Sequence, residues 1–191
     1  MITATATAAA HPVPGFIESE FNPLVLQVAE HCLSGAPGDG ARTAVVLGSF
    51  MGDTTTTDLA STLLISGQVN NPLLFMQATA NSILGYLSRE FKITGPFLAL
   101  SATADLGSEL LSAADLLLDD PELDHVLVIG VELTGKERTA AVYRELDLCL
   151  PAEDLAVALL IDRAESVALA GTAPGDLRQL AELARNSEAK P

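Results

Sequence analysis

Four short apolar runs divide the chain and predict the strands of a sheet. They are Thr43–Leu47 (TAVVL), Phe97–Ser101 (FLALS), His125–Val131 (HVLVIGV) and Leu155–Asp162 (LAVALLID). Each run is nearly continuous rather than alternating, which is typical of buried strands that helices cover on both faces. The N-terminal run Ile2–Ala10 fits either a strand or a frayed start, and Ser166–Ala170 predicts a weaker strand.

The segments between these runs carry helix signals. Asn22 supplies an N-cap and Pro23 stands at the first helical position before LVLQVAEHCL. Further helices are expected over Asp53–Ile65, Gln77–Phe91 in the segment that Pro72 opens, Gly107–Leu118 and Asp176–Asn186. Strands that alternate with helices favour an α/β fold with a mixed, mostly parallel sheet covered on both faces. We expect one domain over residues 1–191, with 187–191 as a loose tail.

The segment Gly95–Leu118 (GPFLALSATADLGSELLSAADLLL) holds the strongest candidate for a functional site. It predicts a buried strand, a tight turn over Ala102–Leu106 and a helix. A strand-to-helix turn of this kind, a nucleophile elbow, holds a side chain at the N-terminus of a helix. Exposed N–H groups and the helix dipole favour negative charge there. We therefore expect Ala104, Asp105 and Gly107 to form such an elbow.

The elbow resembles the active-site turn of the β-ketoacyl synthases, which runs G-P-x-x-x-x-S-T-A-C-A-S-G. Gly95, Pro96, Ser101 and Gly107 match that pattern in order. Ala104 stands where the family carries its cysteine, and a methyl group cannot attack a thioester. The resemblance therefore implies the architecture of an acyl-condensing enzyme without its nucleophile.

Further stretches resemble the same family in the family's order. They are the glycine-containing turn Val46–Ser49, the helix with Asn81 and Gly85, the strand end Val128–Glu132 and the stretch Glu153–Leu160. Together they imply half of a thiolase-type fold, its N-terminal half. The second half of a ketosynthase carries two histidines and a lysine that serve condensation, and nothing in residues 1–191 corresponds to it. The chain thus resembles a truncated ketosynthase-like domain.

The remaining candidates for chemistry are weaker. His11, His31 and His125 stand in no motif of the family, so we expect structural or solvated roles for them. Asp105 is most simply explained as an acid at the start of a helix. A serine nucleophile at Ser108 needs a positioned base, and no histidine is suitably placed in sequence.

Within this family, the chain resembles the chain-length factors of type II polyketide synthases. Such a factor is a ketosynthase-like subunit without the cysteine, which pairs with a catalytic ketosynthase and shapes the tunnel for the growing chain. The resemblance implies this role here, with no catalytic residue. The implied positions at the tunnel and the interface are Phe50, Met51, Thr54, Thr57, Ser61, Leu74, Phe75, Ala78 and Thr79. The spacing of Thr54, Thr57 and Ser61 puts them on one face of a helix.

Composition and charge bear on the partners. The formal net charge is −15 and the pI is about 4.3, which argues against binding nucleic acid through its phosphates. Acyl carrier proteins are typically acidic, so we expect one to dock on the catalytic partner and not on this chain. Hydrophobic residues make up 49% of the chain, which suggests that a partner covers some apolar surface.

No membrane span, metal site or cofactor site is predicted. The apolar runs are broken well before the roughly 18 residues of a span. The segment MITATATAAAHPVPGF lacks Lys and Arg, unlike a secretory signal, so we expect a cytoplasmic location. Cys32 and Cys149 have no metal-ligand spacing, and GAPGDG lacks the lysine of a P-loop.

Two other hypotheses remain open at this point. The chain fits a small thiolase-fold acyltransferase or decarboxylase that uses an unrecognised nucleophile. It also fits an acyl-binding scaffold that associates with itself through the same interface. The three hypotheses differ in whether the chain acts with a ketosynthase, turns over a thioester alone, or forms a homo-oligomer.

Overall fold

The centre of the fold is one mixed five-stranded sheet. The computed structural model describes residues 1–16, 18–34, 40–68, 71, 73–102, 104–170 and 175–188. The strands are β1 (Ile2–Ala6), β2 (Thr43–Gly48), β3 (Phe97–Leu100), β4 (His125–Glu132) and β5 (Leu155–Ile161). The helices are α1 (Phe21–Ser34), α2 (Thr54–Ile65), α3 (Leu73–Gln77), α4 (Ala80–Phe91), α5 (Leu106–Leu118), α6 (Glu137–Glu145), α7 (Arg163–Ala170) and α8 (Leu177–Glu188), with a 3-10 turn η1 (Gly40–Arg42) before β2.

The strand order is β1-β5-β4-β2-β3. β2 pairs with both β3 and β4 in parallel, whereas β5 runs antiparallel to both β1 and β4. Four strands therefore share one direction and β5 opposes them. This arrangement confirms the expected α/β fold with a mixed, mostly parallel sheet.

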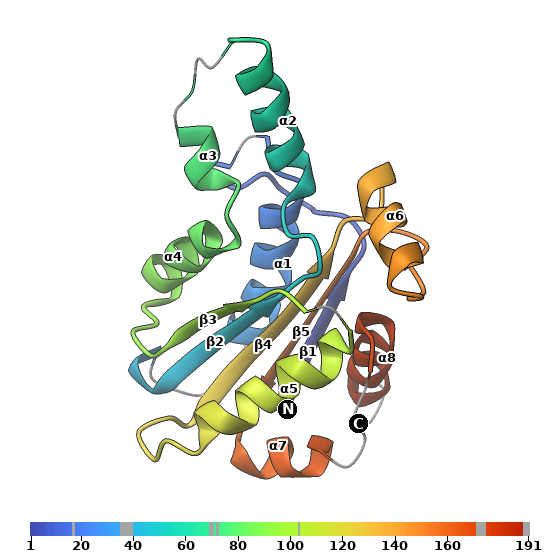
Figure 1. Cartoon of the computed structure of the whole chain (residues 1–191). Coiled ribbons are helices and arrows are strands. Elements are labelled where there is room, and N and C mark those ends of the chain that lie inside the picture. Colours follow the sequence, from blue (N-terminus) through green and yellow to red (C-terminus); the bar gives the residue numbers. More distant parts are fainter. Residues whose placement is uncertain are drawn as a thin grey trace.

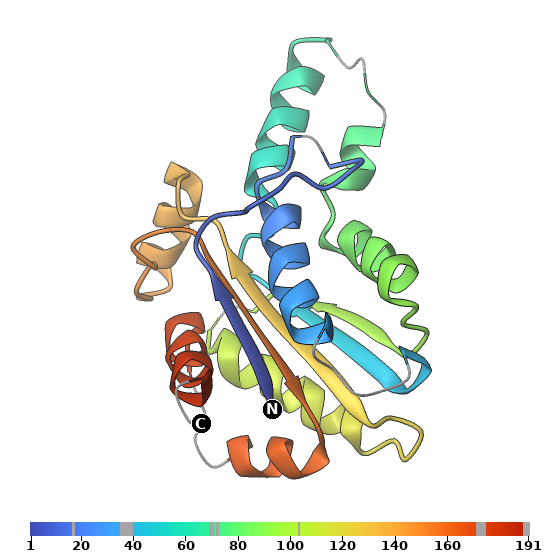
Figure 2. The ribbon, with the colours of Figure 1, turned by 180° about the vertical axis from the view of Figure 1, so that it is seen from behind.

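Helices cover both faces of the sheet (Figures 1 and 2). α1 and α4 pack on one face, against the side chains of Val45 and Leu47 among others. α5 and α8 pack on the other face, against Val46 and Val128, and Leu169 of α7 joins the same cluster. Alternate residues of β2 thus enter opposite cores, which is why its sequence is continuously apolar.

Two glycines face each other on neighbouring strands and admit the helices of the second face. Gly48 of β2 is paired in register with Gly130 of β4. A Cβ atom on Gly48 would lie 2.8 Å from Leu110 Cδ2 and 2.9 Å from Leu106 Cδ1 of α5. A Cβ atom on Gly130 would overlap Leu177 Cδ1 at the start of α8. The side chains of both helices therefore reach down to bare backbone.

The helix α8 closes the second core. Leu177, Leu180, Ala181 and Ala184 point into it and are buried. The hydroxyl of Thr3 in β1 donates a hydrogen bond to the Ala184 carbonyl at 3.1 Å. α8 runs to Glu188, two residues into the segment expected to be a loose tail, while 189–191 lie outside the described residues.

Several expectations about local structure need correction. Ser166–Ala170 belongs to helix α7 and is not a strand, because Asp162 and Glu165 form a reciprocal capping box at its start. The strand β3 is a half-exposed edge and not buried. The helix expected over Gln77–Phe91 is broken at Ala78 and Thr79, which separate α3 from α4.

Other boundaries also differ in detail. The N-terminal run forms strand β1, but only as far as Ala6. α1 begins at Phe21, and its first turn is held by the Ser19 hydroxyl, which accepts the N–H of Asn22 at 2.9 Å. Helix α6 was not expected. The predicted loop at 34–40 lies largely outside the described residues, as does Pro72.

The helices α2 and α3 stand beyond one end of the sheet, and α3 is next to α4 (Figure 1). Large apolar side chains are exposed there: Leu64, Ile65, Leu73, Phe75 and Met76. Ile65 has 88% of its surface accessible. Among the described helices, none has the length and apolar character needed to cross a bilayer.

We predict that truncating one α8 leucine destabilises the whole fold. Leu180→Ala should lower the free energy of unfolding by about 3 kcal/mol, because it leaves a cavity against the sheet. Urea denaturation followed by circular dichroism measures this. The control is Leu116→Ala on α5, where 73% of the side chain is exposed and the loss should stay below about 0.5 kcal/mol. Equal losses in the two variants would show that α8 is not part of the core.

Candidate functional site

The turns after β2 and β3 are joined at the carboxyl edge of the sheet. Ser49 donates its N–H to the Leu100 carbonyl at 3.3 Å. The hydroxyl of Ser101 donates to the Phe50 carbonyl at 3.2 Å. Because these parallel strands end together, the Phe50 turn and the elbow, which are about fifty residues apart in sequence, form one site.

The elbow has the expected strand–turn–helix layout. Ala104 is exposed and lies two residues before α5, which begins at Leu106. Asp105 takes the N-cap position, but its carboxylate makes no capping hydrogen bond among the described residues. Its backbone carbonyl accepts the N–H of Glu109 at 3.0 Å. The described elbow therefore presents a methyl group and an uncommitted carboxylate, while Thr103 lies outside the described residues.

The N-terminus of α5 is occupied by another part of the chain. Gly107 donates its N–H to the carbonyl of Gly175 at 3.2 Å. Gly175 in turn donates its N–H to Gln179 Oε1 at 2.7 Å, so it is tied to the first turn of α8. A Cβ atom on Gly175 would lie 3.2 Å from Asp105 Oδ1. One of the amides that could stabilise a developing oxyanion is thus already used inside the protein.

A buried carboxyl group supports the same edge from beneath. Glu132, the last residue of β4, is completely buried. Its Oε2 accepts the N–H of Phe50 at 2.9 Å, the hydroxyl of Tyr143 at 3.2 Å and the hydroxyl of Ser49 at 3.4 Å. The rings of Phe50 and Tyr143 meet edge to face with their centroids 5.2 Å apart. Glu132 therefore joins β4 and α6 to the turn that carries Phe50.

Burial is the largest influence on the pKa of Glu132. It raises the pKa of Glu132 to about 7, although the hydrogen bonds from Phe50 and Tyr143 favour the ionised form. Burial and the neighbouring carboxyl group also raise the pKa of Tyr143 above its usual value. The other oxygen, Oε1, has no hydrogen-bond partner within the described part of the chain. The site thus holds one carboxyl group that is costly to ionise.

The three polar residues expected to share one face of α2 differ in how far they are buried. Thr54 is buried, Thr57 is partly buried and Ser61 is exposed, because α2 leaves the body of the protein as it proceeds. The hydroxyl of Thr57 donates to the Asp53 carbonyl at 2.7 Å, and that of Ser61 to the Thr57 carbonyl at 2.8 Å. The carboxylate of Asp53 caps the helix by accepting the Thr56 N–H at 3.0 Å.

The other expected residues fall into two groups. Phe50 is buried and Met51 partly buried, and both belong to the same hydrophobic cluster as Ala102 of the elbow. Leu74 is buried in α3, whereas Phe75 and Thr79 are exposed and Ala78 is partly buried. The structure therefore brings Phe50 and Met51 to the elbow. The other four residues, from Leu74 to Thr79, lie in or just after α3, which together with α2 forms an exposed arm beyond the end of the sheet.

Sequence reasoning did not single out Glu132, Tyr143 or Gly175 as parts of the site. Glu132 carries a signal that could have marked it, since it is a charged residue at the end of an otherwise apolar strand. Gly175 and Tyr143 carry no such signal. They reach the site only through the packing of α8 and α6.

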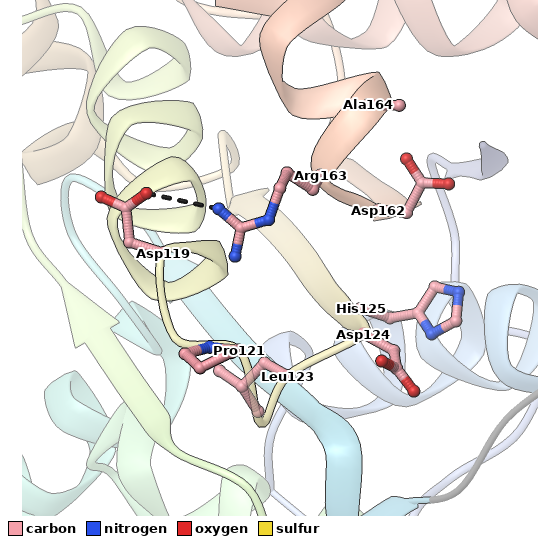
Figure 3. A pocket seen from close by; sticks show the side chains of 8 residues that line it. All are labelled: Asp119, Pro121, Leu123, Asp124, His125, Asp162, Arg163 and Ala164. Carbon is pink, nitrogen blue, oxygen red and sulfur yellow. Dashed lines mark hydrogen bonds and ion pairs between the residues drawn. The ribbon is translucent and has the colours of Figure 1, made fainter.

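A hollow of about 770 Å³ lies at the end of the sheet opposite to the elbow (Figure 3). Its acidic residues are already engaged: Asp119 pairs with Arg163 at 3.3 Å, and Asp124 pairs with Arg42 at 2.7 Å. Asp162 belongs to the capping box of α7. In the part of the chain that the structure describes, no three His, Cys, Asp or Glu side chains are grouped to hold a metal ion.

We predict that Glu132 makes the fold less stable as pH rises. Its pKa is about 7 in the folded protein, against 4.5 as the ordinary value. Between these values the folded state holds a proton that the unfolded state has released, so the free energy of unfolding falls with increasing pH. From pH 5 to pH 8 the loss should be about 2.5 kcal/mol. Urea denaturation across this range measures it.

Matched variants isolate the contribution of Glu132. Glu132→Gln keeps an acceptor for the Phe50 N–H but does not ionise, so the loss of stability should largely disappear. Glu145→Gln, at the exposed end of α6, should behave like the unsubstituted protein. If Glu132→Gln retained the full pH dependence, the buried carboxyl group would not be its source.

Comparisons with known proteins agree with this geometry. A family model described as β-ketoacyl synthase, N-terminal domain, matches residues 20–176. No curated protein sequence matches the chain. Among solved structures, the fold is similar to a ketosynthase (ApeO) in complex with its chain length factor (ApeC) from Xenorhabdus doucetiae, with a TM-score of 0.65 and 21% identity over 83% of this chain and 63% of that one.

Two further structures show the same fold. A β-ketoacyl synthase from Burkholderia phymatum STM815 has a TM-score of 0.63 and 19% identity, over 86% of this chain and 47% of that one. The ishigamide ketosynthase/chain length factor has a TM-score of 0.61 and 17% identity, over 83% of this chain and 45% of that one. The chain thus spans between 45% and 63% of the length of these three chains. With its sheet, its elbow and a family match over most of its length, the chain belongs to the β-ketoacyl synthase family, as an N-terminal domain.

Proposed function

We propose that the chain is a non-catalytic, chain-length-factor-like subunit that pairs with a catalytic ketosynthase in type II polyketide or related chain elongation. Ketosynthase and chain length factor pairs are among the structures similar to it. In this proposal residues 1–191 act as a ketosynthase-like half domain. The cysteine that carries the growing chain belongs to the partner, and this chain needs no cofactor.

The state of the elbow carries the proposal. Ala104 stands in the place of the family's cysteine at the N-terminus of α5 and offers only a methyl group. The Gly107 N–H beside it is bonded to the Gly175 carbonyl. A condensing enzyme needs both a nucleophile and free donors for the oxyanion. The methyl group of Ala104 and the engaged N–H of Gly107 therefore both support a role in which another chain supplies the nucleophile.

Exposed apolar surface supports a partner. The strand β3 lies at the edge of the sheet, and Leu98 on it is 37% exposed. An apolar edge strand readily pairs with a strand of another chain. The neighbouring arm of α2 and α3 adds Leu64, Ile65 and Phe75, which a soluble monomer would rarely expose together. We assign β3 and this arm to the interface with the ketosynthase.

The residues near the elbow would shape the tunnel. Phe50 and Met51 belong to the same hydrophobic cluster as Ala102 of the elbow, and in this proposal their bulky side chains would limit the length of an acyl chain that enters from the partner. Thr54, Thr57 and Ser61 on α2, with Leu74, Phe75, Ala78 and Thr79, would line the path or the interface. The net charge of −15 disfavours an acidic carrier protein, which would instead dock on the partner. A cytoplasmic location fits such a complex.

Co-production with a cysteine-containing ketosynthase from the same biosynthetic locus tests this function. We expect a one-to-one complex in size-exclusion chromatography that elongates a carrier-bound acyl chain, while neither subunit does so alone. Leu98→Lys should weaken the complex at least tenfold, because it places a charge on the edge strand. Leu116→Lys, on an exposed part of α5, should leave it intact.

Two results would contradict the proposal, each in favour of another hypothesis. Turnover of an acyl thioester by the isolated chain would indicate an enzyme with an unrecognised nucleophile, and Asp105 and Ser108 would be tested next. A stable homo-oligomer that never co-purifies with the ketosynthase would indicate a self-associating scaffold.

A further inference from the structure

A hollow of about 410 Å³ lies between the N-terminal segment and the helices α3 and α4, away from the elbow. Figures 1 and 2 both show the segment before α1 passing beside α3. The hollow is open to solvent and is lined mainly by apolar groups, among them Phe16, Leu73, Met76 and Tyr86. Its volume falls within the range of small-molecule sites, roughly 300–1,000 Å³.

The walls of the hollow are built from side chains that differ in exposure. Phe16 is buried and meets the ring of Tyr86 edge to face, with the centroids 6.2 Å apart. Leu73 and Met76 of α3 are 56% and 66% exposed, so they offer apolar surface that the described chain does not cover. A Cβ atom on Gly85 would meet nothing within 4 Å, which leaves open space at the face of α4.

One charged side chain, Arg89, lines this hollow. Its guanidinium carbon lies 5.3 Å from the centroid of the Tyr86 ring, which holds it over the aromatic face. No described carboxylate lies within ion-pair distance of it, whereas Arg42, Arg138, Arg163 and Arg178 each pair with an aspartate. Arg89 is therefore an uncompensated positive charge at an apolar surface.

The charge of this hollow distinguishes it from two other hollows of the described chain. The hollow in Figure 3 contains three aspartates, and the hollow beside His11 contains Glu20 and Asp154. In a chain with a net charge of −15, an anion is attracted only where a cation stands without nearby acids. The apolar walls favour a hydrocarbon chain, and Arg89 favours an anionic end.

We propose that this hollow binds an amphipathic anion, with its hydrocarbon chain against Leu73, Met76 and Phe16 and its carboxylate on Arg89. A medium-chain fatty acid has this chemistry. The hollow is formed by this chain alone and lies away from Ala104, but Leu73 and Met76 belong to the arm assigned to the ketosynthase interface, so its binding is tested on the isolated chain. Its failure in a test on the isolated chain would leave the pairing proposal untouched.

Isothermal titration calorimetry with decanoate, decanol and acetate tests the proposal on the full chain. We expect saturable one-to-one binding of decanoate, with decanol binding more weakly and acetate not at all. Arg89→Gln should weaken decanoate about tenfold and leave decanol unchanged, since it removes only the charged contact. Arg89→Lys should retain most of the affinity for decanoate.

Two further variants complete the design. Gly85→Leu should weaken both decanoate and decanol at least tenfold, because the new side chain enters the open space. Leucine also favours the helix over glycine, so this variant should fold. Arg144→Gln, an exposed arginine on α6, is the matched control and should bind like the unsubstituted chain. Absence of saturable decanoate binding, or equal effects of Arg89→Gln and Arg144→Gln, would overturn the proposal.

Discussion

The structure depends on the close approach of two helices to the bare backbone at Gly48 and Gly130. These glycines are neighbours on parallel strands, and the leucines of α5 and α8 fill the space that their side chains would take. A side chain at either position would require these leucine side chains to move from the places they fill. Because β2 ends at Gly48 and β4 ends two residues after Gly130, the same contact also sets where the N-terminus of α5 meets the edge of the sheet. The elbow is thus positioned by packing, whichever side chain it carries.

The same packing also determines the surroundings of the elbow. Leu177 packs over Gly130. Two residues before Leu177, the Gly175 carbonyl accepts the N–H of Gly107 at the start of α5. On the other side, Glu132 holds the Phe50 turn through one carboxylate oxygen. The Gly107 N–H and the turn that carries Phe50 are thus both held by hydrogen bonds within the chain.

Most of the strands and the elbow could be predicted because their signals are local. The apolar runs at β2, β4 and β5 and the turn before α5 lie within about a residue of the expected positions. Features that depend on tertiary packing were not predictable in this way. The pattern of β3 does not reveal that it lies at an edge, and Ser166–Ala170 reads as a strand until the capping box of Asp162 and Glu165 is considered. Gly175 reaches the elbow only because α8 folds back over the sheet.

The account rests on the claim that the reacting acyl group is never attached to this chain. Intact-protein mass spectrometry tests that claim directly, on a complex with a cysteine-containing ketosynthase that has been loaded from an acylated carrier protein. The account predicts that the acyl mass increment appears on the partner alone and disappears when the partner's cysteine is replaced. An increment on this chain, retained after that replacement, would show that it carries a nucleophile of its own and would contradict the account.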